Sequence, residues 1–218
     1  MNRSSIALVA GLSTFASFAN AAIIVSEVAP WSSGNSSLGS DWFELTNTGN
    51  SAVSITGWKM DDASSSFSSG ATLNGISSIA PGESVIFIES STSKASQFKT
   101  LWFGPNAPAG LQIGQYNGSG LGLSTDGDQV NIFNASGVLQ AKVIFGASDS
   151  AAPFQTFDNR AGINNGTISL LSQIGTNGAF AAASSSVGEV GSPGLIPAPS
   201  ALALLGAAGL VGRRSRKA

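Results

Sequence analysis

Two pairs of closely spaced aspartates are the first candidates for chemistry in this sequence of 218 residues. Asp61 and Asp62 follow an apolar run, and Asp126 and Asp128, separated by one glycine, precede another. Ca²⁺ prefers oxygen ligands of this kind in extracellular loops, so all four are candidate calcium ligands. The competing interpretation is that they only form turns, because neither pair completes an EF-hand or a repeated Gly-rich calcium motif. No other cofactor is expected.

The sequence contains neither cysteine nor histidine. Their absence excludes disulfides, thiol nucleophiles, metal sites with Cys or His ligands, and Ser-His-Asp hydrolysis. A glycosidase remains open in principle, but it needs two carboxyl groups that face each other across a sugar-binding cleft. Sequence spacing does not establish such a geometry. We therefore predict no catalytic residues and no enzymatic activity.

The charges are unevenly distributed along the chain. All 12 acidic residues lie between Glu27 and Glu189, but only five of the 10 basic residues do. That middle part therefore has a formal charge of −7, although the whole chain has −2. An acidic, Lys-poor surface repels phosphate backbones. We expect no nucleic-acid partner.

The N-terminal segment has the order of parts that is typical of a secretory signal peptide. A positive charge at Arg3 is followed by an apolar run, and Ala19 and Ala21 supply the small residues before a cleavage site. We therefore predict a signal peptide over 1–21 that is removed by cleavage after Ala21. The alternative is that this segment forms a buried N-terminal helix.

The C-terminal segment over 196–218 combines prolines, an apolar run and a basic end. Two prolines surround one small residue in Pro197-Ala198-Pro199. The apolar run of about 12 residues would span roughly 18 Å as a helix, which is less than the ~30 Å of a bilayer core. The basic end contains Arg213, Arg214 and Arg216. Because basic residues stay cytoplasmic, we predict a short transmembrane helix with its C-terminus inside.

This order of parts resembles the PEP-CTERM sorting signal that exosortases read. The usual middle residue of the proline motif is Glu, whereas this chain has Ala198. The resemblance implies an inner-membrane intermediate, cleavage near the motif, and then release from or attachment to the cell surface. It also implies an exosortase-type sorting enzyme and the inner membrane as transient partners. A plain tail anchor without processing is the alternative.

Between the two ends, the sequence predicts an antiparallel β domain over 22–180, followed by a Ser/Ala/Gly-rich stalk or last strand over 181–195. Short runs of Val, Ile, Phe and Trp alternate with clusters of Gly, Asn, Asp, Ser and Pro. The expected strands are Ile23–Ala29, Trp42–Asn47, 53–60, Ser84–Glu89, 129–134, Leu139–Phe145 and 167–173. One helix is predicted over 93–102, and 147–165 is expected to be a loop.

Large apolar residues are expected to form the core of this domain. They are Trp42, Phe43, Leu45 and Trp58, and burial of each contributes ~2–3 kcal/mol. Phe43 and Leu45 share one strand face, and Trp42 and Glu44 share the other, which is the pattern of a half-buried strand.

Two glutamates and two aromatic residues have open interpretations. Glu27 and Glu44 need a partner such as a backbone amide or a lysine if they are buried, and exposure is the alternative. Trp31 and Tyr116 occur in Gly/Ser/Asn-rich segments. Their rings are expected either to stack on sugars or to pack against the edge of the domain.

Five motifs occur in the order typical of the lamin tail domain. They are SEV at 26–28, DWFELTNTG at 41–49, ITGW at 55–58, IAPGESV at 79–85 and GDQVNIF at 127–133. The chain resembles that family over about 23–146, and the resemblance implies an all-β fold, an immunoglobulin-like antiparallel β-sandwich.

These observations predict a non-catalytic secreted or cell-surface protein with an adhesive, extracellular-matrix or structural interaction role. Its expected partner is an extracellular protein or polysaccharide. The alternatives are a calcium- or carbohydrate-binding module, or an accessory domain of an extracellular hydrolase system.

Overall fold

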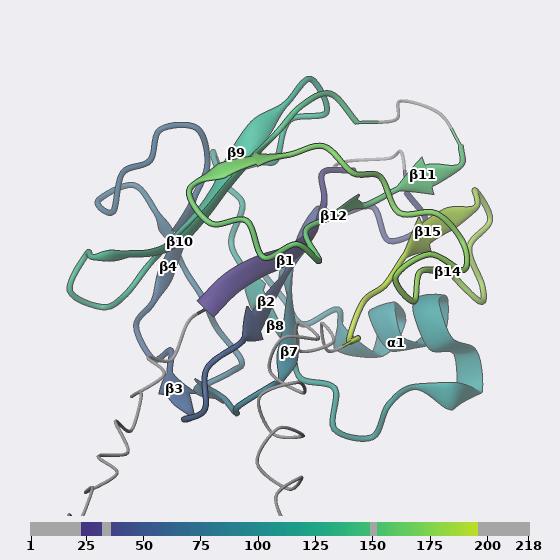
Figure 1. Cartoon of the computed structure of the whole chain (residues 1–218), viewed down its shortest axis with the longest axis horizontal. Helices are drawn as coiled ribbons and strands as arrows, with labels where there is room; N and C mark the ends of the chain where they lie inside the picture. The colour runs from purple at the N-terminus through teal and green to yellow at the C-terminus, as the bar shows by residue number, and fades with distance from the viewer. Residues whose placement is uncertain (1–22, 32–35, 149–151, 196–218) are drawn as a thin grey trace, which may run out of the picture.

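A computed structural model of the chain describes residues 23–31, 36–148 and 152–195. Two β-sheets face each other, and one short α-helix lies beside them (Figure 1). The expectation of an all-β sandwich is therefore confirmed. Among the described residues, no helix is long and apolar enough to cross a membrane.

The predicted terminal signals fall outside the described residues. They are the signal peptide over 1–21 with Ala19 and Ala21, and the sorting segment over 196–218 with Pro197, Ala198, Pro199, Arg213, Arg214 and Arg216. Both signals stay predictions.

Five strands form the first sheet. In spatial order they are β12 (Phe157–Asp158), β1 (Ile23–Ala29), β2 (Trp42–Asn47), β7 (Ser84–Glu89) and β8 (Ile113–Tyr116). Neighbours are antiparallel except β7 and β8, which run parallel. Strand β8 was not expected from the sequence.

Five further strands form the second sheet. In spatial order they are β13 (Gly166–Ile168), β10 (Leu139–Phe145), β9 (Asp128–Phe133), β4 (Lys59–Asp61) and β5 (Ala71–Thr72). Two smaller sheets pair β3 (Val53–Ser54) with β6 (Ser78–Ile79), and β11 (Phe154–Gln155) with β15 (Glu189–Gly191) and β14 (Phe180–Ala181).

The expected strand over 53–60 is wrong in one respect, because a turn divides it into β3 and β4. The Trp58 N–H donates to the Ile55 carbonyl (3.0 Å), and Gly57 between them has a φ of 76°. Glycine adopts this left-handed conformation without steric cost. The turn lets the chain leave the small β3–β6 sheet and enter the second sheet.

The segment over 147–165 is also more ordered than a loop. Its described part contains β11 and β12, which join the small β11–β15–β14 sheet and the edge of the first sheet. The expected strand over 167–173 is shorter and covers only β13. Strands of two or three residues carry little periodicity, so their pattern in the sequence is weak.

The main hydrophobic core lies between the two five-stranded sheets. Phe43, Leu45 and Trp58 belong to it, and the first two are completely buried. The Phe43 ring packs against Phe87 (5.7 Å between centroids) and Tyr116 (5.5 Å).

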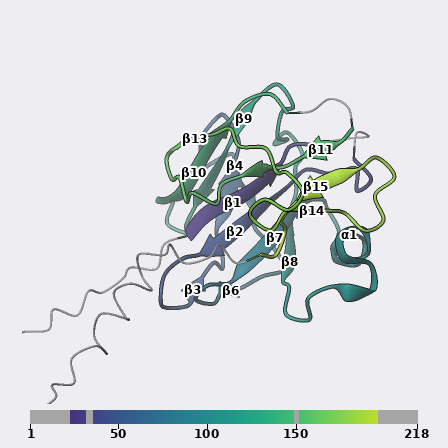
Figure 2. The same ribbon diagram turned by 45° about the vertical axis from the view of Figure 1, so that its right-hand side comes forward.

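A second core covers the outer face of the first sheet. Helix α1 (Ala95–Phe103), which continues into the short helix η1 (Gly104–Asn106), lies against this face (Figure 2). Trp42 of β2 packs edge-on against Phe98 (5.3 Å) and Trp102 (5.6 Å) of α1. Trp42 therefore belongs to this second core and not to the core between the sheets, and β2 is buried on both faces.

Of the two expectations for 181–195, a stalk or a last strand, the structure shows the last strand, β15, which packs onto the body. Glu189, Val190, Gly191, Ser192 and Pro193 are all buried. The folded body thus continues to Leu195.

We expect Phe43→Ala to lower the free energy of unfolding by about 3–5 kcal/mol, because it removes a ring from a densely packed core. The control is Ile174→Ala, since Ile174 is 67% exposed and its loss should change stability by less than about 0.5 kcal/mol. Urea denaturation measures both. Equal effects of the two substitutions would contradict the assigned core.

Candidate functional site

A β-bulge in β1 places two consecutive polar residues on the outer face of the first sheet. The register between β1 and β2 shifts between Val25 and Glu27, so Ser26 is the extra residue. Val25 and Val28 on either side belong to the core between the sheets. Ser26 and Glu27 instead lie beside Glu44, which is opposite Glu27 in the register.

The Glu27 carboxylate is only 1% exposed and binds two segments that are far away in the sequence. Its Oε1 accepts hydrogen bonds from the Ser192 backbone N–H (2.7 Å) and from the Thr156 hydroxyl. Thr156 is linked in turn to the Ser172 hydroxyl (2.7 Å). Of the expected partners, Glu27 thus has a backbone amide.

Glu44 has the same kind of environment. Its Oε1 accepts a hydrogen bond from the Ser26 hydroxyl (2.6 Å), and its Oε2 accepts one from the Gly194 backbone N–H (2.6 Å). The Thr46 hydroxyl donates to Ser26 Oγ (2.8 Å) and lies 2.7 Å from Ser84 Oγ. A chain of hydroxyl groups therefore extends the site across three strands.

The segment over 189–195, which we call the strap, covers both glutamates. Gly191 is its closest point of approach, because a Cβ atom there would lie 2.6 Å from Glu27 Oε1 and 2.9 Å from Trp102 Cη2. Only glycine leaves space for the carboxylate and the indole ring. The strap thus joins the polar site to the second core.

Burial dominates the electrostatics of this pair. Burial, as the larger cause, and the charge of Glu44 together raise the pKa of Glu27 to about 8, against the hydrogen bonds from Thr156 and Ser192. Burial likewise raises the pKa of Glu44 to about 7, against the hydrogen bonds from Ser26 and Gly194. Two carboxyl groups on neighbouring strands cannot both ionise cheaply in a desolvated site.

The candidate calcium ligand Asp61 has a structural role, because its carboxylate holds a loop through hydrogen bonds. Its side chain is completely buried. Its Oδ2 accepts hydrogen bonds from the Ser64 hydroxyl (2.7 Å) and the Ser66 N–H (2.8 Å), and its Oδ1 accepts one from the Ser69 hydroxyl (3.1 Å). These bonds close the Ser-rich loop that follows. The Asp62 Oδ1 accepts the Ser64 N–H (3.2 Å).

The other candidate ligands also accept local hydrogen bonds or are exposed. The Asp128 carboxylate accepts the N–H groups of Ser124 (3.1 Å) and Gln129 (2.8 Å), and Asp126 is exposed. Within the described ranges, no three acidic residues form a group that could hold a metal ion. The structure therefore does not bring the four aspartates into one site.

Trp31 and Tyr116 are both buried and do not present ring faces to sugars. Trp31 is 1% exposed and packs against Trp42 (6.3 Å) in the second core. Tyr116 is completely buried and belongs to the core between the sheets. The stacking interpretation of these two residues is wrong, because the sheets and the α1 region enclose the segments that were expected to be loops.

Sequence reasoning did not single out Asp41 as a site residue. Its side chain is completely buried, and its Oδ2 accepts the Leu123 N–H (2.8 Å). Burial raises the pKa of Asp41 to about 8, and the charge of Glu89 contributes to this rise. Only its place before Trp42 in the second motif could have indicated a special role.

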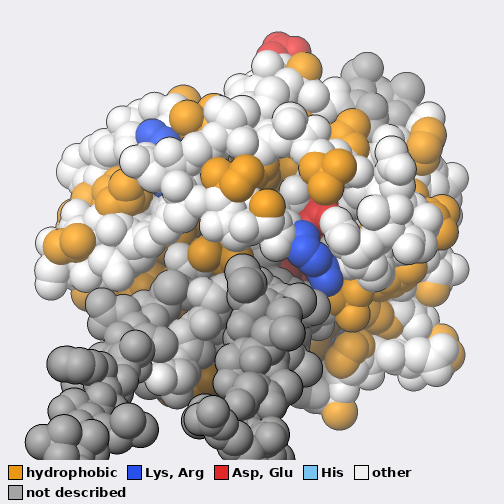
Figure 3. All heavy atoms as spheres, in the orientation of Figure 1, with side chains coloured by type: hydrophobic (Ala, Val, Ile, Leu, Met, Phe, Trp, Pro, Cys, Tyr) orange, Lys and Arg blue, Asp and Glu red, His pale blue; other side chains and the backbone are white. Residues whose placement is uncertain are grey.

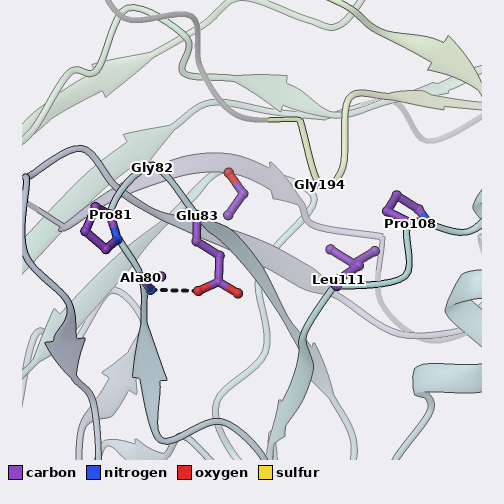
Figure 4. A pocket seen from close by; sticks show the side chains of 9 residues that line it. Ala80, Pro81, Gly82, Glu83, Pro108, Leu111 and Gly194 are labelled. Carbon is purple, nitrogen blue, oxygen red and sulfur yellow. Dashed lines mark hydrogen bonds between the residues drawn. The ribbon is translucent and has the colours of Figure 1, made fainter.

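A groove of about 370 Å³ lies where the strap ends (Figure 4). The turn that contains Pro81 and Glu83 forms one side, Pro108 and Leu111 form the other, and Gly194 completes the lining. Glu83 is the ionisable residue among them, and its two oxygens accept hydrogen bonds from Ala80 N–H (2.7 Å) and Gln112 Nε2 (2.7 Å). The groove contains no pair of carboxyl groups for acid–base work.

The lamin tail domain family matches residues 16–147. This chain belongs to the lamin tail domain family. The match confirms the resemblance that the sequence motifs indicated, and the family is immunoglobulin-like and non-catalytic. No curated protein and no solved structure shows significant similarity to the chain.

The lamin tail domain match contains both glutamates but none of the partners that come from the C-terminal part. Glu27 and Glu44 lie inside the matched range, whereas Thr156, Ser192 and Gly194 lie beyond it. These partners carry no motif of their own, so sequence reasoning missed them. In this chain, the residues after 147 complete the outer face of the domain.

We expect Asp61→Ala to lower the free energy of unfolding by about 1–3 kcal/mol, because the half-buried Ser66 N–H and two serine hydroxyls lose their acceptor. The matched control is Asp62→Ala, which should cost less than about 1 kcal/mol, since half-buried Asp62 accepts one long bond. Thermal denaturation with Ca²⁺ or EDTA should give the same midpoint. A Ca²⁺-dependent rise that Asp61→Ala abolishes would show instead that Asp61 is a calcium ligand.

Proposed function

We propose that this chain is an exported, non-catalytic β-sandwich protein that is displayed at the cell surface or released from it. There it has an adhesive, extracellular-matrix or structural role and contacts an extracellular protein or polysaccharide. Export begins with the predicted signal peptide over 1–21, and an exosortase-type enzyme processes the predicted sorting segment over 196–218.

The position of the two ends of the folded body is the observation that carries this proposal. Ile24, near the start of β1, pairs with Thr46, which pairs with Ser84. The Ser84 hydroxyl lies 3.4 Å from the carbonyl oxygen of Leu195, the last described residue. Both ends of the body therefore lie at the same end of the first sheet. This arrangement suits a body that is held at one end and presents its opposite end.

The charge and chemistry of the described surface favour a binding role over catalysis. Figure 3 shows a face on which charged side chains are few and uncharged polar and apolar groups predominate. The carboxyl pair Glu27–Glu44 is enclosed and does not face a cleft. A surface rich in Ser, Asn and Thr offers hydrogen bonds to sugars and peptides without strong electrostatic steering.

Mass spectrometry of the protein from cell and medium fractions tests the export part. We expect an N-terminus at Ala22 or Ile23 and a C-terminus that lacks Arg213–Ala218. A variant with Arg213→Ala, Arg214→Ala and Arg216→Ala should remain unprocessed, because it has lost most of the basic end that fixes membrane orientation. An exported protein with an intact Arg213–Ala218 end would contradict processing.

Attachment of cells to a surface tests the interaction part. Cells that lack the chain should attach less well, and the wild-type chain should restore attachment. A chain with Phe43→Ala should restore it poorly, because its body is partly unfolded. Normal attachment without the chain would contradict an adhesive role.

A further inference from the structure

We propose that the strap over 189–195 is a releasable clamp, and that ionisation of the Glu27–Glu44 pair lifts it from the first sheet while the sandwich stays folded. In the closed state, the strap binds the Glu27–Glu44 pair of its own chain. The pair binds the turn that follows β15 through two N–H groups two residues apart, those of Ser192 and Gly194.

The strap is well placed to respond to charge, because it is the cover of both carboxyl groups. The Ser192 N–H lies 2.7 Å from Glu27 Oε1, and the Gly194 N–H lies 2.6 Å from Glu44 Oε2. Removal of the strap would open the outer face over both glutamates to water. Hydration relieves the cost of burying an ionised carboxylate.

The charged groups around the pair are mostly acidic. Across the sheet, β12 contributes Asp158, whose charge raises the pKa of Glu27 further. Arg160 opposes Asp158 and lowers the pKa of Glu44. One cation therefore faces three carboxyl groups when Glu27 and Glu44 are counted. The strap also carries Glu189, whose Oε1 accepts the Ser37 N–H (3.1 Å) instead.

The direction of the pH effect follows from the raised pKa values. A carboxyl group whose pKa is raised to about 7 or 8 by burial in the docked state, and is lower once water reaches it, binds its proton more tightly when docked. Docking is therefore strongest in acid, weakens as the pH rises through about 7, and reaches its minimum above about pH 8. The clamp closes in acid and loosens in mild alkali.

The strap can leave without unfolding the sandwich because few ladder contacts hold it. Strand β15 pairs with β11 and β14 over two residues each. By contrast, β1 and β2 pair over six positions, and their inner faces form the main core. Local opening of a segment with few ladder contacts costs less than global unfolding.

Release has a consequence for sorting, and this consequence rests on the proposed function. The strap ends at Leu195, directly before the predicted sorting segment over 196–218. Its seven residues would lengthen the tether between the body and that segment by about 23 Å when extended. A loosened clamp would thus give a membrane-bound processing enzyme better access to the chain.

Hydrogen–deuterium exchange of the full chain tests the clamp directly, whether or not the chain is processed. Exchange is measured from about pH 5 to about pH 9 and corrected for the intrinsic pH dependence of amide exchange. Protection of peptides that cover the strap should fall roughly tenfold or more between about pH 6 and about pH 8. Protection of β9 should stay constant. Constant strap protection, or a parallel loss in β9, would overturn the proposal.

Two substitutions separate the pair from the rest of the chain. Glu27→Gln with Glu44→Gln keeps one acceptor oxygen in each side chain and replaces the other with an NH2 group. Neither amide can ionise, so strap protection should lose its pH dependence. The single Glu44→Gln should reduce the response without abolishing it, because Glu27 can still ionise but loses the charge of Glu44 that raises its pKa. The control Glu83→Gln removes a half-buried carboxylate in the turn before β7 and should leave the response unchanged. A wild-type response in the double variant would refute the role of the pair.

Gly191→Ala provides an independent opening of the clamp. The added Cβ would clash with Glu27 Oε1 and Trp102, so strap protection should already be low at about pH 5, with β9 still protected. Gly146→Ala is the matched control, because a Cβ at Gly146 meets nothing within 4 Å. Full strap protection in Gly191→Ala would contradict the close docking on which the clamp depends.

Discussion

The docking of backbone N–H groups onto two buried carboxyl groups ties together the parts of this protein. Glu27 and Glu44 lie on neighbouring strands, and a buried carboxyl group requires hydrogen-bond donors to offset its loss of solvent. The donors come from Ser192 and Gly194, about 150 residues or more away in the chain. The C-terminal segment of the folded body is therefore held against its first two strands. This contact also encloses the outer face of the first sheet.

Enclosure of the first sheet on both faces explains the two hydrophobic cores. Strand β2 alternates in the way expected of a sandwich strand, with Phe43 and Leu45 directed inward. Its other face would lie in water in a simple two-sheet sandwich. Here α1 and the strap cover that face, and Trp42, Trp31 and Trp102 pack together beneath them. The same two segments, α1 and the strap, thus cover both the polar and the apolar residues of this face.

This distribution of groups also limits the chemistry of the protein. Among the described residues, the most perturbed carboxyl groups are enclosed in packed structure, and the four candidate calcium ligands accept hydrogen bonds or are exposed. Perturbed pKa values often indicate catalytic groups, but here the physical cause is burial without access for a substrate. The same feature supplies a pH-sensitive contact, so the pair is better suited to conformational control than to turnover.

The sequence by itself determined the β-sandwich, its family and its longest elements. Four strands have the predicted bounds, because six or seven residues of strand pattern between turn residues give a clear signal. It also predicted that Glu27 and Glu44 need partners if they are buried, but left exposure open. Only the tertiary structure decided what those partners are, because Thr156, Ser192 and Gly194 belong to short strands and turns without periodicity. The same holds for Trp31, Tyr116 and Asp61, whose roles depend on which distant segment covers them. Local patterns specify strands, but the cover of a sheet face is set by contacts between segments far apart in the chain, and no local pattern records them.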